Sequence, residues 1–150
     1  MKLNGTLSLS VPPEVAAEGF QDPKTLGIFL PKNSQLTRAG PGEFSFVVIK
    51  EAGIVALKLP GTLTVTPSGA GYLFEARAKH LIGGSATLSL ALTFVPGGDG
   101  CEMTYDGTLE STGLAGRMLR ERADHTQSVL DARFAAVKAE IESFYRSYAV

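Results

Sequence analysis

The sequence predicts an α+β protein in which one curved antiparallel sheet of seven strands wraps around a long C-terminal helix. Apolar residues recur at spacings of three and four from residue 113 to 148, which is typical of one helical face. Between residues 34 and 110, apolar and polar residues alternate, and Gly and Pro interrupt the alternation, as in an antiparallel meander. At 1.5 Å per residue the helix would be about 50 Å long, so its apolar face needs a broad surface to cover it.

The composition sets limits on the class of protein. A chain of 150 residues suits a single domain, 1–150, with a sizeable core. A formal net charge of −1 gives no general attraction to nucleic acid or anionic lipid, and no apolar run reaches the roughly 18 residues of a membrane span, so we expect membrane contact to be peripheral at most. Cys101 alone cannot form an internal disulfide and no secretory signal pattern is present, which together predict a cytoplasmic protein.

The first strand and the two short helices have clear local signals. Apolar and polar residues alternate from Lys2 to Val11, and Pro12-Pro13 ends the strand and opens a helix over 13–19. Asp22 is the expected N-cap of a second helix with Pro23 at its first position, and this helix is expected to end before Pro31.

The remaining strands are separated by turn signals. These signals lie at residues 38–42, 51–53, 66–71, 80–84 and 96–100. Within the strand that contains Leu57 and Leu59, Pro60-Gly61 predicts a bulge or bend. A curved sheet closed by a helix can hold a cavity, unless other side chains fill it.

Several short motifs occur in an order and spacing that resemble a known family. They are Met1–Gly5, Pro13 with Val15, Asp22–Leu26, Leu30-Pro31, Gly84–Ala86, Gly98–Gly100, Met103–Tyr105 and the helical segment Gly113–Ile141. Together they resemble the CoxG family of carbon monoxide dehydrogenase-associated proteins, within the SRPBCC or START-like helix-grip superfamily. The chain departs from the family pattern at Ala16, where similar proteins have Trp, and at Pro31-Lys32-Asn33, where they have Pro-Gly-Cys.

The resemblance implies a helix-grip (START/Bet v 1-like) fold with an apolar cavity between sheet and helix. It further implies non-catalytic binding of a lipid-like or quinone-like molecule, with no cofactor, and as a possible partner a molybdenum-containing carbon monoxide dehydrogenase-like enzyme. Small side chains on the expected inner faces, among them Ala76 and Thr126, would leave space for a ligand. The candidate ligand-binding residues are Phe29, Leu57, Leu59, Phe74, Ala76, Ala78, His80, Leu90, Tyr105, Leu119, Ala123, Thr126, Leu130 and Phe134.

The polar candidates leave alternatives open. His80 either orients a ligand oxygen at the rim or faces water, and the hydroxyl of Tyr105 bonds either ligand or protein. No Cys, Asp or Glu lies at metal-ligand spacing from His80 or His125, so no metal site is predicted. Cys101, close to Asp99 and Glu102, lacks the surroundings that favour a thiolate.

Two other functions remain possible from the sequence. Other helix-grip families suggest a protein-interaction or co-chaperone-like module. An enzyme of the cyclase or hydratase kind would need acid and base groups inside the cavity, for which His80 and Tyr105 are the only candidates. We also expect the two short helices, with Phe29 among their apolar residues, to move as a lid over the cavity.

Overall fold

The computed structural model describes residues 1–30, 34–52, 55–80, 84–113 and 123–148. Strand β1 (Lys2–Leu9) is followed by the helices α1 (Pro13–Gly19) and α2 (Pro23–Leu26) and the 3-10 helix η1 (Gly27–Phe29). Next come β2 (Gln35–Gly40), β3 (Glu43–Ala52), β4 (Val55–Ser68), β5 (Gly71–His80), β6 (Gly84–Gly97) and β7 (Gly100–Ser111), and finally α4 (Ala123–Tyr148). This order confirms the predicted α+β architecture, although residues 114–122 of the predicted terminal helix lie outside the described residues.

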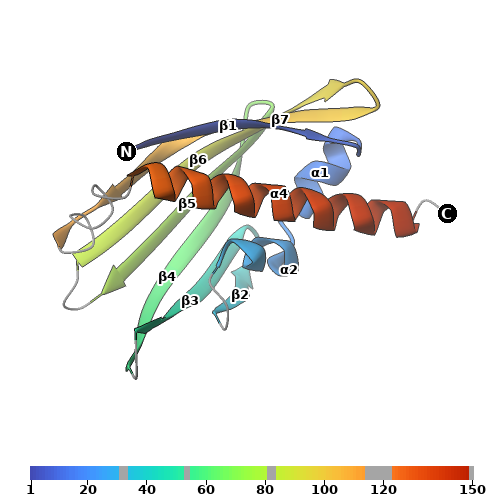
Figure 1. The fold of residues 1–150 in the computed structure, drawn as a ribbon. Helices are drawn as coiled ribbons and strands as arrows, with labels where there is room; N and C mark the ends of the chain where they lie inside the picture. The colour runs from blue at the N-terminus through green and yellow to red at the C-terminus, as the bar shows by residue number, and fades with distance from the viewer. Residues whose placement is uncertain (31–33, 53–54, 81–83, 114–122, 149–150) are drawn as a thin grey trace.

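The seven strands form one antiparallel sheet in the order β1-β7-β6-β5-β4-β3-β2. The two edges are therefore β1 and β2, which are joined by α1, α2 and η1 on one side of the sheet. Figure 1 shows α4 lying along that same side, across the strands. The curved sheet and the helices thus form two layers, as the sequence predicts.

The short helices begin where the sequence signals place them. Pro13 occupies the first turn of α1, and Pro23 that of α2. The Asp22 side chain caps α2 by accepting a hydrogen bond from the Lys24 backbone N–H at 3.0 Å. Because η1 follows α2 directly, the chain turns again and brings Phe29 toward α4.

Of the bulge or bend predicted at Pro60-Gly61, the bulge is absent from the pairing of β3 with β4. The pairing of β3 with β4 keeps one register from Glu43↔Thr64 through Val47↔Pro60 to Ala52↔Val55, and the register shift in this part of the sheet lies between Arg38 and Gly40 instead. Gly61 serves a close approach, because a Cβ at this position would lie 2.3 Å from Cζ of the Phe46 ring. The signal at Pro60-Gly61 therefore marks a packing requirement rather than an irregular ladder.

Helix α4 is held over the sheet by apolar packing and by hydrogen bonds between its Glu142 side chain and Ser10. Its 26 residues span about 39 Å. Phe134, Val137 and Ile141 are buried, while the Glu142 carboxylate accepts hydrogen bonds from the backbone N–H (2.7 Å) and the hydroxyl of Ser10 at the end of β1. No helix in the described part of the chain is both long and apolar enough to cross a membrane.

The apolar stripe predicted for the second half of this helix is confirmed only in part. Val137 and Ile141 belong to the core, but Phe144, which shares their spacing of three and four residues, is 64% exposed. The half-buried Tyr145 continues the stripe in its place. Phe144 lies seven residues after Val137, and in a helix of 3.6 residues per turn this step falls about 20° short of two full turns, away from the side of Ile141 and Phe134.

Candidate functional site

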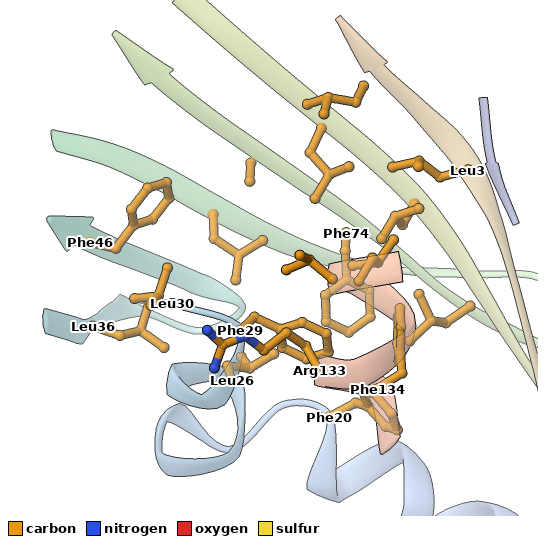
Figure 2. A pocket seen from close by; sticks show the side chains of 18 of the residues that line it. Leu3, Phe20, Leu26, Phe29, Leu30, Leu36, Phe46, Phe74, Arg133 and Phe134 are labelled. Atoms are coloured by element: carbon orange, nitrogen blue, oxygen red, sulfur yellow. The ribbon is translucent and has the colours of Figure 1, made fainter. Parts of the chain in front are cut away.

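A cavity of about 570 Å³ lies between the concave face of the sheet and α4. It is lined by Leu3, Phe20, Leu26, Phe29, Leu30, Leu36, Phe46, Leu63, Phe74, Ala76, Leu88, Leu90, Leu92, Leu109, Thr126, Val129, Leu130, Arg133 and Phe134. Figure 2 shows these side chains converging from the strands, from α4 and from the α2–η1 segment. Its size is in the range of pockets that take drug-sized molecules.

The space exists because the described part of α4 makes its main backbone approach to the sheet at the edge strand β1. The other elements whose backbones come close to α4 are α1, α2 and η1, whereas β5 and β6 contribute side chains such as Phe74 and Leu90 to the cavity wall. Ala76 leaves room on β5, where its paired neighbours are Leu63 and Leu88. The alternation along these strands puts the apolar residues on the cavity side.

A cluster of aromatic rings closes one end of the cavity. The Phe134 ring lies 4.9 Å from that of Phe29, edge to face, and 6.0 Å from that of Phe20. On its other side it stacks on Tyr105, with centroids 4.3 Å apart and planes 15° from parallel. Phe134 is 2% exposed and so joins the helix, the η1 segment and the sheet at a single point.

The cavity reaches solvent along α4. Val129 lines the cavity and is nevertheless 41% exposed, so the wall opens beside it. One turn farther along the helix, Arg133 also lines the cavity and donates from Nη1 to the Ile28 backbone oxygen at 3.2 Å. Figure 2 shows the Arg133 side chain reaching from α4 past Phe29, with its guanidinium group beside Leu26 and Phe29. The mouth is therefore framed by α4 and η1.

Tyr105, predicted as a cavity residue, is not among the lining residues. Its ring lies beneath Phe134 and fits against Gly5, where a Cβ would be 2.5 Å from the ring. Its hydroxyl donates to Asp131, and the Gln127 side-chain N–H groups bond the Tyr105 oxygen and Asp131, each at 2.9 Å. The hydroxyl thus has protein partners, and Tyr105 supports the cavity wall from behind.

Burial, then the hydrogen bond to Asp131, raises the pKa of Tyr105 to about 12, from an ordinary value of 10.0. Between pH 10 and 12 the unfolded chain would release this proton while the folded protein keeps it, so stability is expected to fall by up to about 3 kcal/mol. The stability of Tyr105→Phe should fall less steeply over this pH range than that of the wild type. Urea unfolding of the wild type and Tyr105→Phe from pH 9.5 to about 12 measures the difference. Free energies of unfolding that depend on pH in parallel in the two proteins would contradict the prediction.

Two further candidates on the strands lie outside the cavity. Leu59 and Ala78 are not among the lining residues, whereas the Phe46 ring, which fits against Gly61, the residue paired with Ala78, is one of them. The side chains of Leu57, His80 and Ala123 are not described, and Leu119 lies outside the described residues. Their roles stay predictions.

Seven of the predicted residues do meet around the cavity: Phe29, Phe74, Ala76, Leu90, Thr126, Leu130 and Phe134. Several lining residues were missed although their strand alternation pointed inward, namely Leu3, Leu63, Leu88, Leu92 and Leu109. Val129 could have been found from the helical spacing, since it lies three residues after Thr126. Arg133 was missed because its charge predicts the solvent side of the helix.

Neither metal nor thiol chemistry gains support. Among the described side chains, no three His, Cys, Asp or Glu residues gather as a metal site. Cys101 is buried, and the pKa of its thiol is raised first by burial and then by Glu14. The unfavourable setting predicted for a thiolate is confirmed, but its causes differ from the expected Asp99 and Glu102.

Comparison with solved structures identifies the fold. A conserved protein from Geobacillus kaustophilus superposes with a TM-score of 0.76 at 19% identity over 95% of this chain and 96% of that one. Ara h 8.0201 superposes at 0.63 and 14% identity, over 95% of this chain and 98% of the other. The di-domain ARO/CYC BexL of the BE-7585A biosynthetic pathway superposes with a TM-score of 0.58 at 11% identity, over 95% of this chain and 49% of that one.

These neighbours share the helix-grip, Bet v 1-like fold, which is therefore the fold of this chain. At such low identity the likeness shows the fold alone. No protein-family model and no curated protein sequence matches the chain, so the resemblance to the CoxG family is not confirmed.

Proposed function

We propose that the protein binds a hydrophobic small molecule in the cavity beneath α4 and does so without catalysing a reaction. The observation that carries this proposal is the cavity itself, about 570 Å³ of space lined almost entirely by apolar side chains. Interiors normally pack to the density of organic crystals, so a space of this size is unusual unless something occupies it. Expelling water from such walls is the driving force available for binding.

The non-catalytic part of the proposal rests on the chemistry of the walls. Of the lining residues that the structure describes, Thr126 and Arg133 alone carry polar side-chain groups. Neither group titrates near neutral pH, so neither suits general acid or base catalysis. Tyr105, a candidate acid, is covered by Phe134 and has a raised pKa.

The resemblance of the sequence to the CoxG family is what supports a more specific version. In that version the ligand is lipid-like or quinone-like, and the protein acts beside a molybdenum-containing carbon monoxide dehydrogenase-like enzyme in the cytoplasm. Purification from the native host, followed by identification of co-purifying proteins, tests this part. Recovery of the binding protein with its small molecule but without such an enzyme would remove the partner and leave ligand binding intact.

Organic extraction of the purified protein followed by mass spectrometry tests the core of the proposal. We expect an apolar compound in an amount comparable to the protein. The neutral apolar dye Nile red should bind with one-to-one stoichiometry after extraction. A protein that releases no compound and binds no dye would contradict the proposal.

Phe29→Ala is expected to speed ligand exchange more than it lowers stability. Phe29 is half-buried, lines the cavity and touches Phe134 only at its edge, so the substitution widens the mouth between η1 and α4. Loss of about 1.4 kcal/mol of contact corresponds to roughly tenfold faster dye release. Stopped-flow displacement of Nile red measures the rate, and thermal melting measures the stability. An unchanged release rate with a large drop in melting temperature would show that Phe29 is an ordinary core residue.

A further inference from the structure

Among the described residues that line the cavity, Arg133 is the one with a charged side chain. It projects from the middle of α4, one turn beyond the exposed Val129, and is half-buried between α4 and η1. Figure 2 shows its guanidinium group beside Phe29 and Leu26, with apolar side chains on the cavity side. A cation is therefore placed where an apolar ligand would meet solvent.

The guanidinium group is anchored but incompletely paired. Its Nη1 donates to the Ile28 backbone oxygen at 3.2 Å, which fixes the group against η1. Within the described part of the chain, the ion pair found is Lys24 with Glu140, so no described carboxylate lies within 4 Å of Arg133. No described side-chain nitrogen is both buried and unpartnered, so any Arg133 nitrogen without a protein partner is accessible to solvent.

An arginine in this position keeps its charge, because the guanidinium group does not lose its proton in proteins. A ligand that fills the cavity would displace water from the guanidinium group. A neutral ligand would leave the charge less well solvated, whereas an anionic group would replace the lost water with charge-assisted hydrogen bonds. The arrangement therefore favours a ligand with an oxyanion at one end.

We propose that the molecule bound in this cavity is an amphipath with a single carboxylate, held with its apolar part among Phe74, Leu90 and Leu130 and its carboxylate at Arg133. This inference rests on the proposed function, since it specifies the chemical class of the ligand at the same site. The two oxygens of a carboxylate match the parallel N–H groups of a guanidinium. A single carboxylate also balances the one positive charge, whereas a doubly charged phosphate would be left partly uncompensated.

The test compares two matched ligands by displacement of Nile red. Dodecanoate and methyl dodecanoate have the same chain and the same two oxygens, but only the first is charged. Wild-type protein is expected to bind dodecanoate at least about tenfold more tightly than the ester, in line with one charge-assisted hydrogen-bonded pair. This preference should shrink as the salt concentration rises.

Variants assign the preference to Arg133. Arg133→Met should bind both ligands about equally, with the ester affinity within about twofold of wild type, and Arg133→Lys should retain part of the preference. Arg146→Met is the matched control, because it removes the same charge from an exposed position on the same helix. It should leave the affinities for dodecanoate and its methyl ester unchanged. Thermal melting confirms that each variant is folded.

The outcomes separate the two proposals. If wild-type protein binds the ester as tightly as dodecanoate, or if Arg133→Met keeps the full preference, the carboxylate assignment is overturned while ligand binding stands. If neither ligand nor the dye binds to wild-type protein, the proposed function fails and the assignment fails with it. Preference in the wild type that is lost in Arg133→Met and kept in Arg146→Met supports the assignment.

Discussion

Phe134→Ala is expected to lower the free energy of unfolding by about 3–5 kcal/mol, the usual cost of removing a buried phenylalanine from a core. The ring is 2% exposed and packs against Phe20, Phe29 and Tyr105. Its loss would join the cavity to the space above Tyr105, so the walls could not collapse to fill it. The protein would lose the contact that joins α4 to both η1 and the sheet.

Urea unfolding of the variant and the wild type measures this loss. Phe144→Ala is the matched control, since it makes the same substitution on the same helix at a position that is 64% exposed. We expect the control to cost less than about 1 kcal/mol. If Phe134→Ala also cost less than about 1 kcal/mol, the aromatic cluster would not be the junction described above.

Ala76→Phe is expected to weaken binding of Nile red at least about a hundredfold, or about 2.7 kcal/mol. Ala76 faces the cavity between Leu63 and Leu88, so a phenyl ring at this position would occupy the space of the ligand. Because the ring would fill empty space in an apolar pocket, stability should stay the same or rise. Loss of binding without loss of stability would separate blockage of the cavity from unfolding.

Fluorescence titration measures the affinity, and urea unfolding measures the stability of the same samples. Ala91→Phe is the control, because Ala91 is exposed on the opposite face of the neighbouring strand β6. This variant should bind the dye like the wild type. Equal dye affinity in Ala76→Phe and the wild type would place the dye outside the cavity.

The order and type of the elements could be predicted because each has a local cause. Proline opens α1 and α2, alternation marks the strands, and Gly or Pro separates them. The same alternation put Phe74, Ala76 and Leu90 on the inner face. These features depend on neighbours in sequence, and the fold follows from adding them together.

The cavity wall could be predicted less well because it depends on which inward side chains cover which others. Tyr105 shares the inward face of β7, yet it lies behind Phe134 because Gly5 on the paired strand leaves room for its ring. Leu59 and Ala78 are likewise absent from the wall, whereas Phe46, whose ring fits against Gly61, is part of it. Alternation along a strand predicts which face of the sheet a side chain lies on. Whether that side chain reaches the cavity depends on packing between elements that are distant in sequence.

Arg133 shows a different limit of sequence analysis. On the helix it falls beside Phe134 and would ordinarily be assigned to the solvent side as a charged residue. The structure turns its guanidinium toward η1 and the cavity mouth because the Ile28 backbone oxygen accepts a hydrogen bond there. No periodicity in the sequence encodes that contact, which joins residues 105 positions apart.

A crystal structure with a brominated apolar ligand, such as bromododecane, tests most directly whether this cavity binds hydrophobic molecules. The bromine can be located by its anomalous scattering without any assumption about the pose of the chain. We expect its peak inside the space bounded by Phe29, Leu90 and Phe134. A cavity closed by rearranged side chains with no bromine inside, or bromine bound only on the outer surface, would contradict the proposal.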